Sequence, residues 1–286
     1  MNCFFVSDLH GQLTRYEKLF DRILAERPQA LFIGGDLLPS PFIVLSNKTL
    51  KHDNFINDYL MVELKNIKAV LGDAYPDVFV ILGNDDGRMG EETMRQVNRQ
   101  GLWEYCHCRP VSWLDFTIYG YSYIPPTPFR LKDWERFDVS ETVAPGSIAP
   151  KKGIFTVAVS EHQLEHATIA EDLTQLTAGA HFERSIFLFH SPPYFSKLDR
   201  AGLDGRTIDH MALDVNVGSR AIQQFIAAKQ PLLTLHGHIH ESTRLTGSWR
   251  EKFNHTESFN AAHDGPELAL IRFNPHNLQT ATRELL

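Results

Sequence analysis

Five short apolar runs in this sequence each stop at a carboxylate, amide or imidazole side chain. The runs end at Asp8-Leu9-His10, at Gly35-Asp36, at Gly83-Asn84-Asp85-Asp86, at His190, and at Gly237-His238-Ile239-His240. Apolar runs of this length fit buried parallel strands, and in open α/β sheets the functional site lies outside the carboxyl ends of the strands. Five strand ends that present oxygen and nitrogen ligands in one place therefore predict a metal centre.

The spread of these residues along the chain bears on the number of domains. A chain of 286 residues suggests about two domains on average. The proposed ligands, however, run from Asp8 to His240, so most of the chain must close around one site. We therefore expect a single domain over residues 1–286, with a proline-rich insertion at about 123–181.

The charge balance limits the classes of partner. The chain has 28 Lys and Arg against 35 Asp and Glu, a formal net charge of −7. Non-specific nucleic-acid binding needs a basic face, so this balance disfavours it. A small phosphorylated substrate remains compatible with a negative chain, because bound cations can dominate the local field. The oligomeric state stays open.

The cysteines and the amino-terminal residues indicate the cytoplasm as the expected location. The three cysteines, Cys3, Cys106 and Cys108, are odd in number and lack the spacing of a disulfide framework, which indicates a reducing environment. The first apolar run breaks at Asp8 and no basic segment precedes it, unlike a signal peptide. No apolar stretch approaches the roughly 20 residues of a membrane span. We expect a cytoplasmic protein that does not enter a membrane.

Apolar spacing along the chain predicts the elements around the site. Helical spacing covers residues 13–27, 55–71, 91–100, 161–176 and 219–229. Beyond the five runs, strands are expected as a pair over 111–123, and at 154–159, 243–249, 258–262, 268–273 and 279–285. An alternating strand–helix start followed by a β-rich end indicates an α/β protein, with two packed sheets flanked by helices.

The residue types at the strand ends suit two metal ions. Divalent metals in phosphoryl chemistry favour mixed carboxylate, amide and imidazole ligands. A two-metal site also needs a bridging group, ligands on both sides, and open positions for water and substrate. In an extended segment, residues two apart share a side, so His238 and His240 point the same way, as do Asp8 and His10. The candidate metal ligands are Asp8, His10, Asp36, Asn84, His190, His238 and His240.

In this order the motifs Asp-x-His, Gly-Asp, Gly-Asn, His and Gly-His-x-His resemble the calcineurin-like metallophosphoesterase superfamily over most of the chain. The resemblance implies a four-layer αββα sandwich, with two packed mixed β-sheets flanked by helices. It also implies two divalent metal ions, drawn from manganese, iron, zinc or nickel, with Asp36 as the bridge. The first ion would take Asp8, His10, Asp36 and His240, and the second Asp36, Asn84, His190 and His238.

The implied activity is phosphoester hydrolysis, by in-line attack of a metal-bridging hydroxide on phosphorus, with His10, Asn84 and Asp85 as catalytic residues. This sequence departs from the family pattern at one place. The common motif is Gly-Asn-His followed by an acidic residue, and Asp85 stands where that histidine would stabilise the phosphoryl group or protonate the leaving oxygen. Subgroup members that replace this histidine tend towards phosphodiesters, so a phosphodiesterase is expected ahead of a monoesterase.

Other functions fit parts of the sequence less well. A phosphomonoesterase or protein phosphatase would fit the same ligands but not Asp85. A non-catalytic metal-binding scaffold on the same fold would usually have lost ligands, whereas this chain keeps all seven. His162, Glu165 and His166 match the inverted zincin motif, yet nothing else in the chain suggests a protease. The residues of Cys106-His107-Cys108 lie too close together for a structural zinc knuckle, which favours local packing.

A few residues near the motifs have open roles. His236, just before Gly237, fits a supporting contact to the ligands and a plain strand end equally well. Arg88 has the geometry to reach a phosphate, although a solvated loop arginine is the more common case. Arg130 and His52 lie in insertions near the expected cleft, where solvent exposure is again the expected state.

Overall fold

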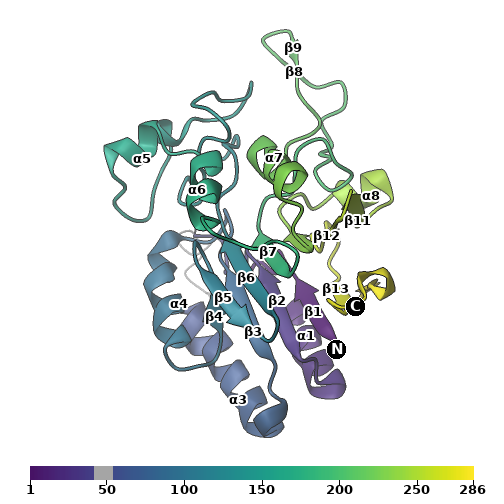
Figure 1. The fold of residues 1–286 in the computed structure, drawn as a ribbon. Coiled ribbons are helices and arrows are strands. Elements are labelled where there is room, and N and C mark those ends of the chain that lie inside the picture. The colour runs from purple at the N-terminus through teal and green to yellow at the C-terminus, as the bar shows by residue number, and fades with distance from the viewer. Residues whose placement is uncertain (42–53) are drawn as a thin grey trace.

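Two six-stranded β-sheets pack face to face in the computed structural model (Figure 1), which describes residues 1–41 and 54–286. His52 lies outside the described residues. The strand order is β14-β13-β1-β2-β3-β4 in the first sheet and β11-β12-β10-β7-β6-β5 in the second. In both sheets parallel strands occupy the centre and antiparallel strands lie towards the edges, so both sheets are mixed.

Four strands of the first sheet run parallel: β1 (Cys3–Val6), β2 (Ala30–Gly34), β3 (Asp77–Ile81) and β4 (Glu104–Tyr105). An antiparallel pair completes it, β13 (Ala269–Phe273) and β14 (Thr282–Leu285). The parallel strands of the second sheet are β6 (Phe116–Tyr121), β7 (Ser185–Phe189), β10 (Leu233–His236) and β12 (Thr256–Asn260). Its edges are β5 (Pro110–Trp113) and β11 (Arg250–Phe253).

Alternating side chains create the layers. Successive residues of a strand point to opposite faces, so Phe5 packs between the two sheets while Phe4 packs outwards. In the second sheet, Leu188 faces inwards, and Phe187 faces outwards against Phe225 of α7. The helices that cover the sheets are α1 (Leu13–Glu26), α3 (Met61–Leu71), α4 (Glu91–Asn98), α6 (Ile169–Leu176) and α7 (Arg220–Lys229). The predicted four-layer αββα sandwich is confirmed.

Several predicted helices have different limits from those expected. The helix expected over 55–71 starts as one turn of π-helix, Ile56–Leu60, and continues as α3. The helix expected over 161–176 is two helices, α5 (Glu161–Glu165) and α6. The break occurs because the Thr168 side chain accepts a hydrogen bond from the Glu171 N–H and so starts a new helix. Short 3₁₀ turns lie at Gly72–Ala74, Arg88–Gly90, Pro150–Lys152 and Leu278–Thr280.

Two predicted strands are wrong. In residues 154–159, Ile154 forms only an isolated bridge with Leu131, and the Thr156 N–H donates to the Asp133 side chain at 2.8 Å instead of to a neighbouring strand. Residues 243–249 contain the helix α8 (Ser242–Thr246), which ends at Gly247 in the left-handed conformation.

Two long connections project beyond one end of the sheets (Figure 1). One contains α5 and α6, and the other contains the small hairpin of β8 (Thr207–Ile208) and β9 (Met211–Ala212). Within residues 1–41 and 54–286, no helix combines the length and the apolar character needed to cross a membrane.

Candidate metal centre

The loops that leave five central strands meet at one edge of the sandwich. Loops after β1, β2 and β3 of the first sheet bring two carboxylates, one amide and one imidazole, on Asp8, Asp36, Asn84 and His10. Loops after β7 and β10 of the second sheet bring three imidazoles, on His190, His238 and His240. The oxygen donors therefore come from one sheet, and most of the nitrogen donors come from the other.

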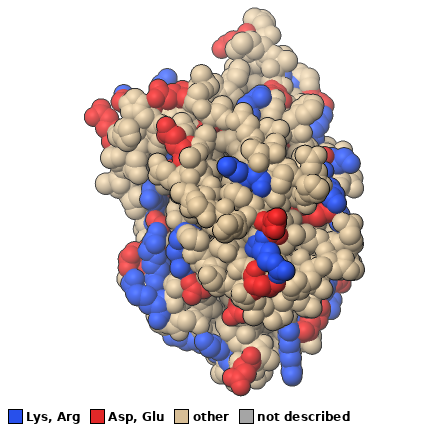
Figure 2. Space-filling view, in the orientation of Figure 1, with Lys and Arg blue, Asp and Glu red and all other residues tan. Residues whose placement is uncertain are grey.

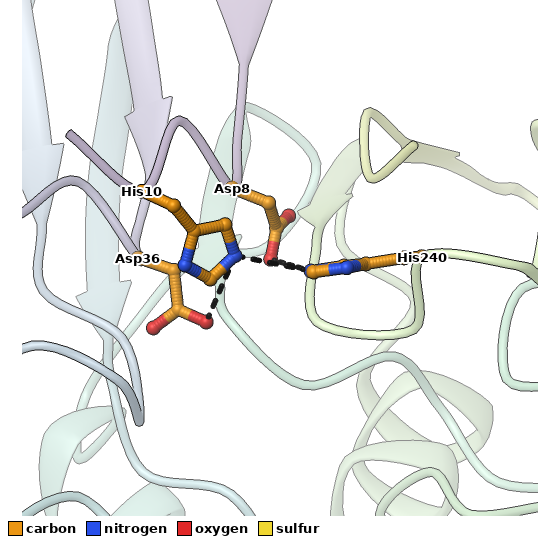
Figure 3. Close-up of side chains that lie close together, drawn as sticks. All are labelled: Asp8, His10, Asp36 and His240. Atoms are coloured by element: carbon orange, nitrogen blue, oxygen red, sulfur yellow. Dashed lines mark hydrogen bonds and ion pairs between the residues drawn. The ribbon is translucent and has the colours of Figure 1, made fainter. Parts of the chain in front are cut away.

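Four of these side chains form a first cluster, in which they point toward one another (Figure 3). Their candidate ligand atoms all lie within 4.8 Å of one another. His240 Nε2 is 3.2 Å from Asp8 Oδ1 and 3.2 Å from His10 Nε2. His10 Nε2 is also 3.9 Å from Asp36 Oδ2. This is the set that the family resemblance implies for the first ion.

Asp36 also belongs to a second cluster, with His190 and His238, whose candidate ligand atoms again lie within 4.8 Å of one another. His190 Nε2 is 3.3 Å from Asp36 Oδ2 and 3.0 Å from Asn84 Oδ1, so the amide joins this group. The two clusters share one carboxylate, which is the arrangement that a bridged pair of ions requires.

Burial and charge compete at this site. Burial alone would raise the pKa values of the carboxyls, but nearby histidines hold the pKa of Asp8 below its usual range and that of Asp36 at about 2. Burial likewise disfavours charged His10 and His190, yet the surrounding carboxylates raise both pKa values to about 9. His238 differs, since burial and the neighbouring His190 lower its pKa to about 3. The buried carboxylates therefore favour positive charge between them.

Supporting contacts aim the donor atoms. The Nδ1–H of His190 donates to the carbonyl oxygen of Gly34 at 2.8 Å, which leaves Nε2 facing Asp36 and Asn84. Such a hydrogen bond fixes the tautomer and the ring orientation of a metal-ligating histidine. Carboxylate and amide oxygens together with imidazole nitrogens suit several divalent metals, so the residues present fit two such ions.

The loops that carry the donors are tightly wound. Asp8, His10, Asp36 and His238 all have positive φ angles, of 58°, 49°, 51° and 71°. Such a conformation is uncommon for residues other than glycine and costs free energy. The backbone of Gly83 packs directly against the Asp36 side chain, so a Cβ added at Gly83 would clash with Asp36 Oδ1. Gly83 is therefore required for Asp36 to hold its position.

A cleft of about 520 Å³ opens over the two clusters. Its floor includes His10, Asp36, Asn84, His238 and His240, and Asp85 and Glu241 also line it. Ile239 adds to it, and the remaining lining comes from the two long connections, residues 125–147 and 201–217. The candidate metal ligands thus face a space large enough for a small substrate.

Comparison with known proteins agrees with this geometry. The family description of calcineurin-like phosphoesterases matches residues 1–242. The chain belongs to the calcineurin-like phosphoesterase family. Membership supports a phosphoester hydrolase that uses divalent metal ions. No protein among the curated sequences matches the chain.

Solved structures share the fold of this phosphoesterase at low identity. TT1561 of Thermus thermophilus is 14% identical with a TM-score of 0.56, and the match covers 99% of this chain and 98% of that one. A dimetal phosphatase from Danio rerio is 14% identical with a TM-score of 0.50, covering 95% of this chain and 91% of that one. At such identity the likeness shows the fold alone.

Asp85, where the phosphoesterase departs from the family motif, contacts both the ligands and the cleft. Its backbone N–H donates to Asp36 Oδ1 at 2.7 Å, and its Oδ1 accepts from Ser40 Oγ at 2.8 Å. Its Oδ2 lies 3.3 Å from His10 Nδ1. A carboxylate on the far nitrogen of a ligating histidine fixes the orientation of the ring. Asp85 is therefore placed to position His10, a role that the sequence did not suggest.

Asp86 is a supporting residue that the sequence reasoning missed. Its buried carboxylate accepts hydrogen bonds from the backbone N–H groups of Leu37 at 3.1 Å, Leu38 at 2.7 Å and Gly83 at 2.8 Å. It thereby ties the loop after β2, which carries Asp36, to the loop after β3, which carries Asn84. The signal was present, because an acidic residue follows the histidine position in the family motif.

Replacing Asp86 by alanine should lower the free energy of unfolding of the metal-free phosphoesterase by about 3 kcal/mol, because three buried N–H groups would lose their acceptor. Replacing Asp86 by asparagine should lower the free energy of unfolding by less, since the amide carbonyl oxygen can still accept hydrogen bonds from these N–H groups. Urea denaturation of both variants measures the difference. Equal stability of Asp86→Ala and the unaltered protein would contradict this role.

The residues with open roles form their described contacts with residues other than the candidate metal ligands. His236 is buried, donates from Nδ1 to the Ser191 carbonyl at 2.9 Å and accepts at Nε2 from Thr234 Oγ1 at 2.7 Å. Burial lowers its pKa to about 4, so it is a neutral strand-end residue. Arg88 bonds Glu91 and lies over the Trp134 ring, away from the cleft. Arg130 is exposed and outside the described cleft lining.

The inverted zincin motif and the Cys-His-Cys segment form contacts that do not resemble a metal site. In the inverted zincin motif, Glu165 pairs with Lys151, and His166 Nδ1 is 2.7 Å from Glu141. The exposed His162 and His166 and the half-buried Glu165 are not part of either donor cluster found in the described part of the chain. In the Cys-His-Cys segment, the buried His107 accepts from the Ser122 N–H at 3.1 Å and packs edge-on against Trp134, which agrees with local packing.

Proposed function

We propose that this chain is a dinuclear-metal-dependent phosphodiesterase. The observation that carries the proposal is Asp36, a buried carboxylate shared by two donor clusters under an open cleft. One ion would be held by Asp8, His10, Asp36 and His240, and the other by Asp36, Asn84, His190 and His238.

The chemistry divides between the ions and the side chains. When bound, the two ions would activate water as the nucleophile for in-line attack and stabilise charge on the phosphoryl oxygens. Asn84 lines the cleft beside Asp36, where its amide can orient a phosphoryl oxygen. Asp85 holds the His10 ring in place through Nδ1, so that Nε2 faces the first cluster. His10, Asn84 and Asp85 are the side chains proposed to act in catalysis.

The charges in the cleft support a diester substrate. Asp85 and Glu241 both line the cleft, and both carry carboxyl groups. A monoester is largely a dianion near neutral pH, and these groups would repel it more strongly than the monoanion of a diester. A carboxylate is also a poor proton donor at that pH, so a diester with a good leaving group is favoured.

Metal reconstitution crossed with substrates tests the function. The metal-free protein would be loaded in turn with manganese, iron, zinc and nickel, and assayed with bis(p-nitrophenyl) phosphate and p-nitrophenyl phosphate. We expect about two ions per chain by elemental analysis and faster turnover of the diester. Two bound ions without turnover of either ester would identify a scaffold, and faster turnover of the monoester would identify a monoesterase.

Domain, partner and location remain parts of the proposal. Residues 1–286 are proposed to act as one domain, because both sheets combine strands from distant parts of the chain, up to β14 at the carboxyl end. A small phosphorylated substrate is the proposed partner. A cytoplasmic location stays a prediction.

The surface carries charges of both signs. Figure 2 shows acidic side chains among the basic ones on the face in view.

A further inference from the structure

The cleft over the metal-binding donors has an apolar wall. One side is built from residues 125–131, including Pro125, Pro126, Pro128, Phe129 and Leu131. Leu203 and Val217 of the second long connection add to it. No lysine or arginine lines the cleft within the described chain, and its charged groups outside the donor clusters are Asp85 and Glu241.

Phe129 is the most conspicuous part of this wall. Its side chain is 62% exposed although it lines a cleft beside polar donors. Exposed apolar surface in a concave site marks a place where a ligand covers it. The neighbouring Pro128 is also exposed, and Pro125 and Pro126 are half-buried. This surface therefore suits an apolar group of a ligand.

A buried ion pair and its hydrogen bonds hold the apolar wall in place. Lys132 and Glu135 form a buried ion pair. Glu135 accepts hydrogen bonds from the Thr127 N–H at 2.7 Å and from Thr127 Oγ1 at 2.6 Å, while Lys132 Nζ donates to the Thr127 carbonyl oxygen at 2.8 Å. Both sides of Thr127 are fixed, and the flanking prolines restrict the backbone further. A preformed wall loses little entropy when a ligand binds.

We propose that the cleft selects phosphodiesters with at least one uncharged apolar arm of about the size of an aromatic ring. This inference rests on the proposed phosphodiesterase function and names its substrate class. The phosphoryl group would face the donor clusters, and the arm would lie against Phe129 and the proline wall. An anionic arm that extends away from the donor clusters would meet Asp85 and Glu241 with no lysine or arginine along the described lining, so a second phosphate is disfavoured.

Two phosphinates test the wall without turnover. Diphenylphosphinate and dimethylphosphinate are stable monoanions that present the same two oxygens and differ only in their arms. Calorimetric titration of the metal-loaded protein should show diphenylphosphinate binding at least tenfold more tightly. Removal of about 60 Å² of phenyl surface from water is sufficient for a gain of about that size.

Matched variants locate the effect. Phe129→Ala should weaken diphenylphosphinate about fivefold or more, because the aromatic ring would lose part of its contact area, and should leave dimethylphosphinate unchanged. Phe195→Ala is the control, since Phe195 is 76% exposed and lies outside the described cleft lining. It should change neither affinity. Because both phenylalanines are exposed, neither substitution should disturb the fold.

The titrations and the turnover assay test the apolar-arm proposal and the phosphodiesterase function separately. Turnover of bis(p-nitrophenyl) phosphate, together with equal affinities for the two phosphinates, overturns the apolar-arm proposal alone. That proposal also fails if Phe129→Ala and Phe195→Ala weaken diphenylphosphinate alike. No turnover by the metal-loaded protein overturns the phosphodiesterase function, and the substrate class is lost with it.

Discussion

Replacing Asp36 by asparagine should lower the metal content below two ions per chain and reduce turnover by at least about a thousandfold, because both clusters would lose their shared carboxylate. A carboxylate can bridge two ions through its two oxygens, whereas an amide offers one oxygen and a nitrogen that does not bind metal well. The Asp85 N–H can still donate to the remaining carbonyl oxygen, so the loop should keep its shape.

The measurement combines elemental analysis with a diesterase assay on the reconstituted variant. Asp21→Asn is a suitable control, because Asp21 lies exposed on α1 and away from the donor clusters. It should retain both ions and full turnover. Two bound ions and near-normal activity in Asp36→Asn would show that the carboxylate does not bridge.

Replacing Asp85 by histidine should shift the preference towards phosphomonoesters by about tenfold or more and make turnover less sensitive to the leaving group. An imidazolium can donate a proton to a departing oxygen near neutral pH, which general-acid catalysis requires and a carboxylate does poorly. The substitution also removes a negative charge that lines the cleft. Aryl esters with graded leaving-group pKa values would measure both effects.

The Asp85→Asn variant separates the effect of the removed charge from the effect of an added general acid. It removes the charge but supplies no acid, and its carbonyl oxygen can still accept from Ser40 or His10. We expect this variant to relieve the repulsion of monoesters while keeping the steep dependence on the leaving group. If Asp85→His leaves both the ratio of diester to monoester turnover and the leaving-group dependence unchanged, the interpretation of this position is wrong.

The sequence was sufficient to predict the layers and to bring the donors together, because both depend on simple periodicity. A strand buried on both faces reads as a nearly continuous apolar run. The strands β1, β2, β3 and β7 do so, and β10 is interrupted only by Thr234 before it ends at His236. Parallel strands expose their carboxyl ends at one edge, so the residues that follow them must meet. The position of these residues therefore follows from the strands alone.

The loops were less predictable, because their contacts are set by the tertiary fold. Residues 154–159 have strand-like composition, but Asp133 binds the Thr156 backbone and competes with strand pairing. The contact from Asp85 to His10 joins loops 75 residues apart, and no local pattern encodes it. The same is true of the wall at Phe129, which depends on the buried pair of Lys132 and Glu135 behind it.

The left-handed backbone at four donors has an evolutionary consequence. Asp8, His10, Asp36 and His238 hold a conformation that glycine adopts without strain, so each position carries about 1 kcal/mol of backbone strain. At Asp8 and Asp36 a glycine would also remove carboxylates that accept the backbone N–H groups of His238 and Asp85, which costs more than the strain it relieves. His238 differs, because burial and the neighbouring His190 lower its pKa and its neutral ring forms no ion pair within the described chain to lose. In a lineage released from selection for activity, His238 should therefore change to glycine before the two carboxylates change.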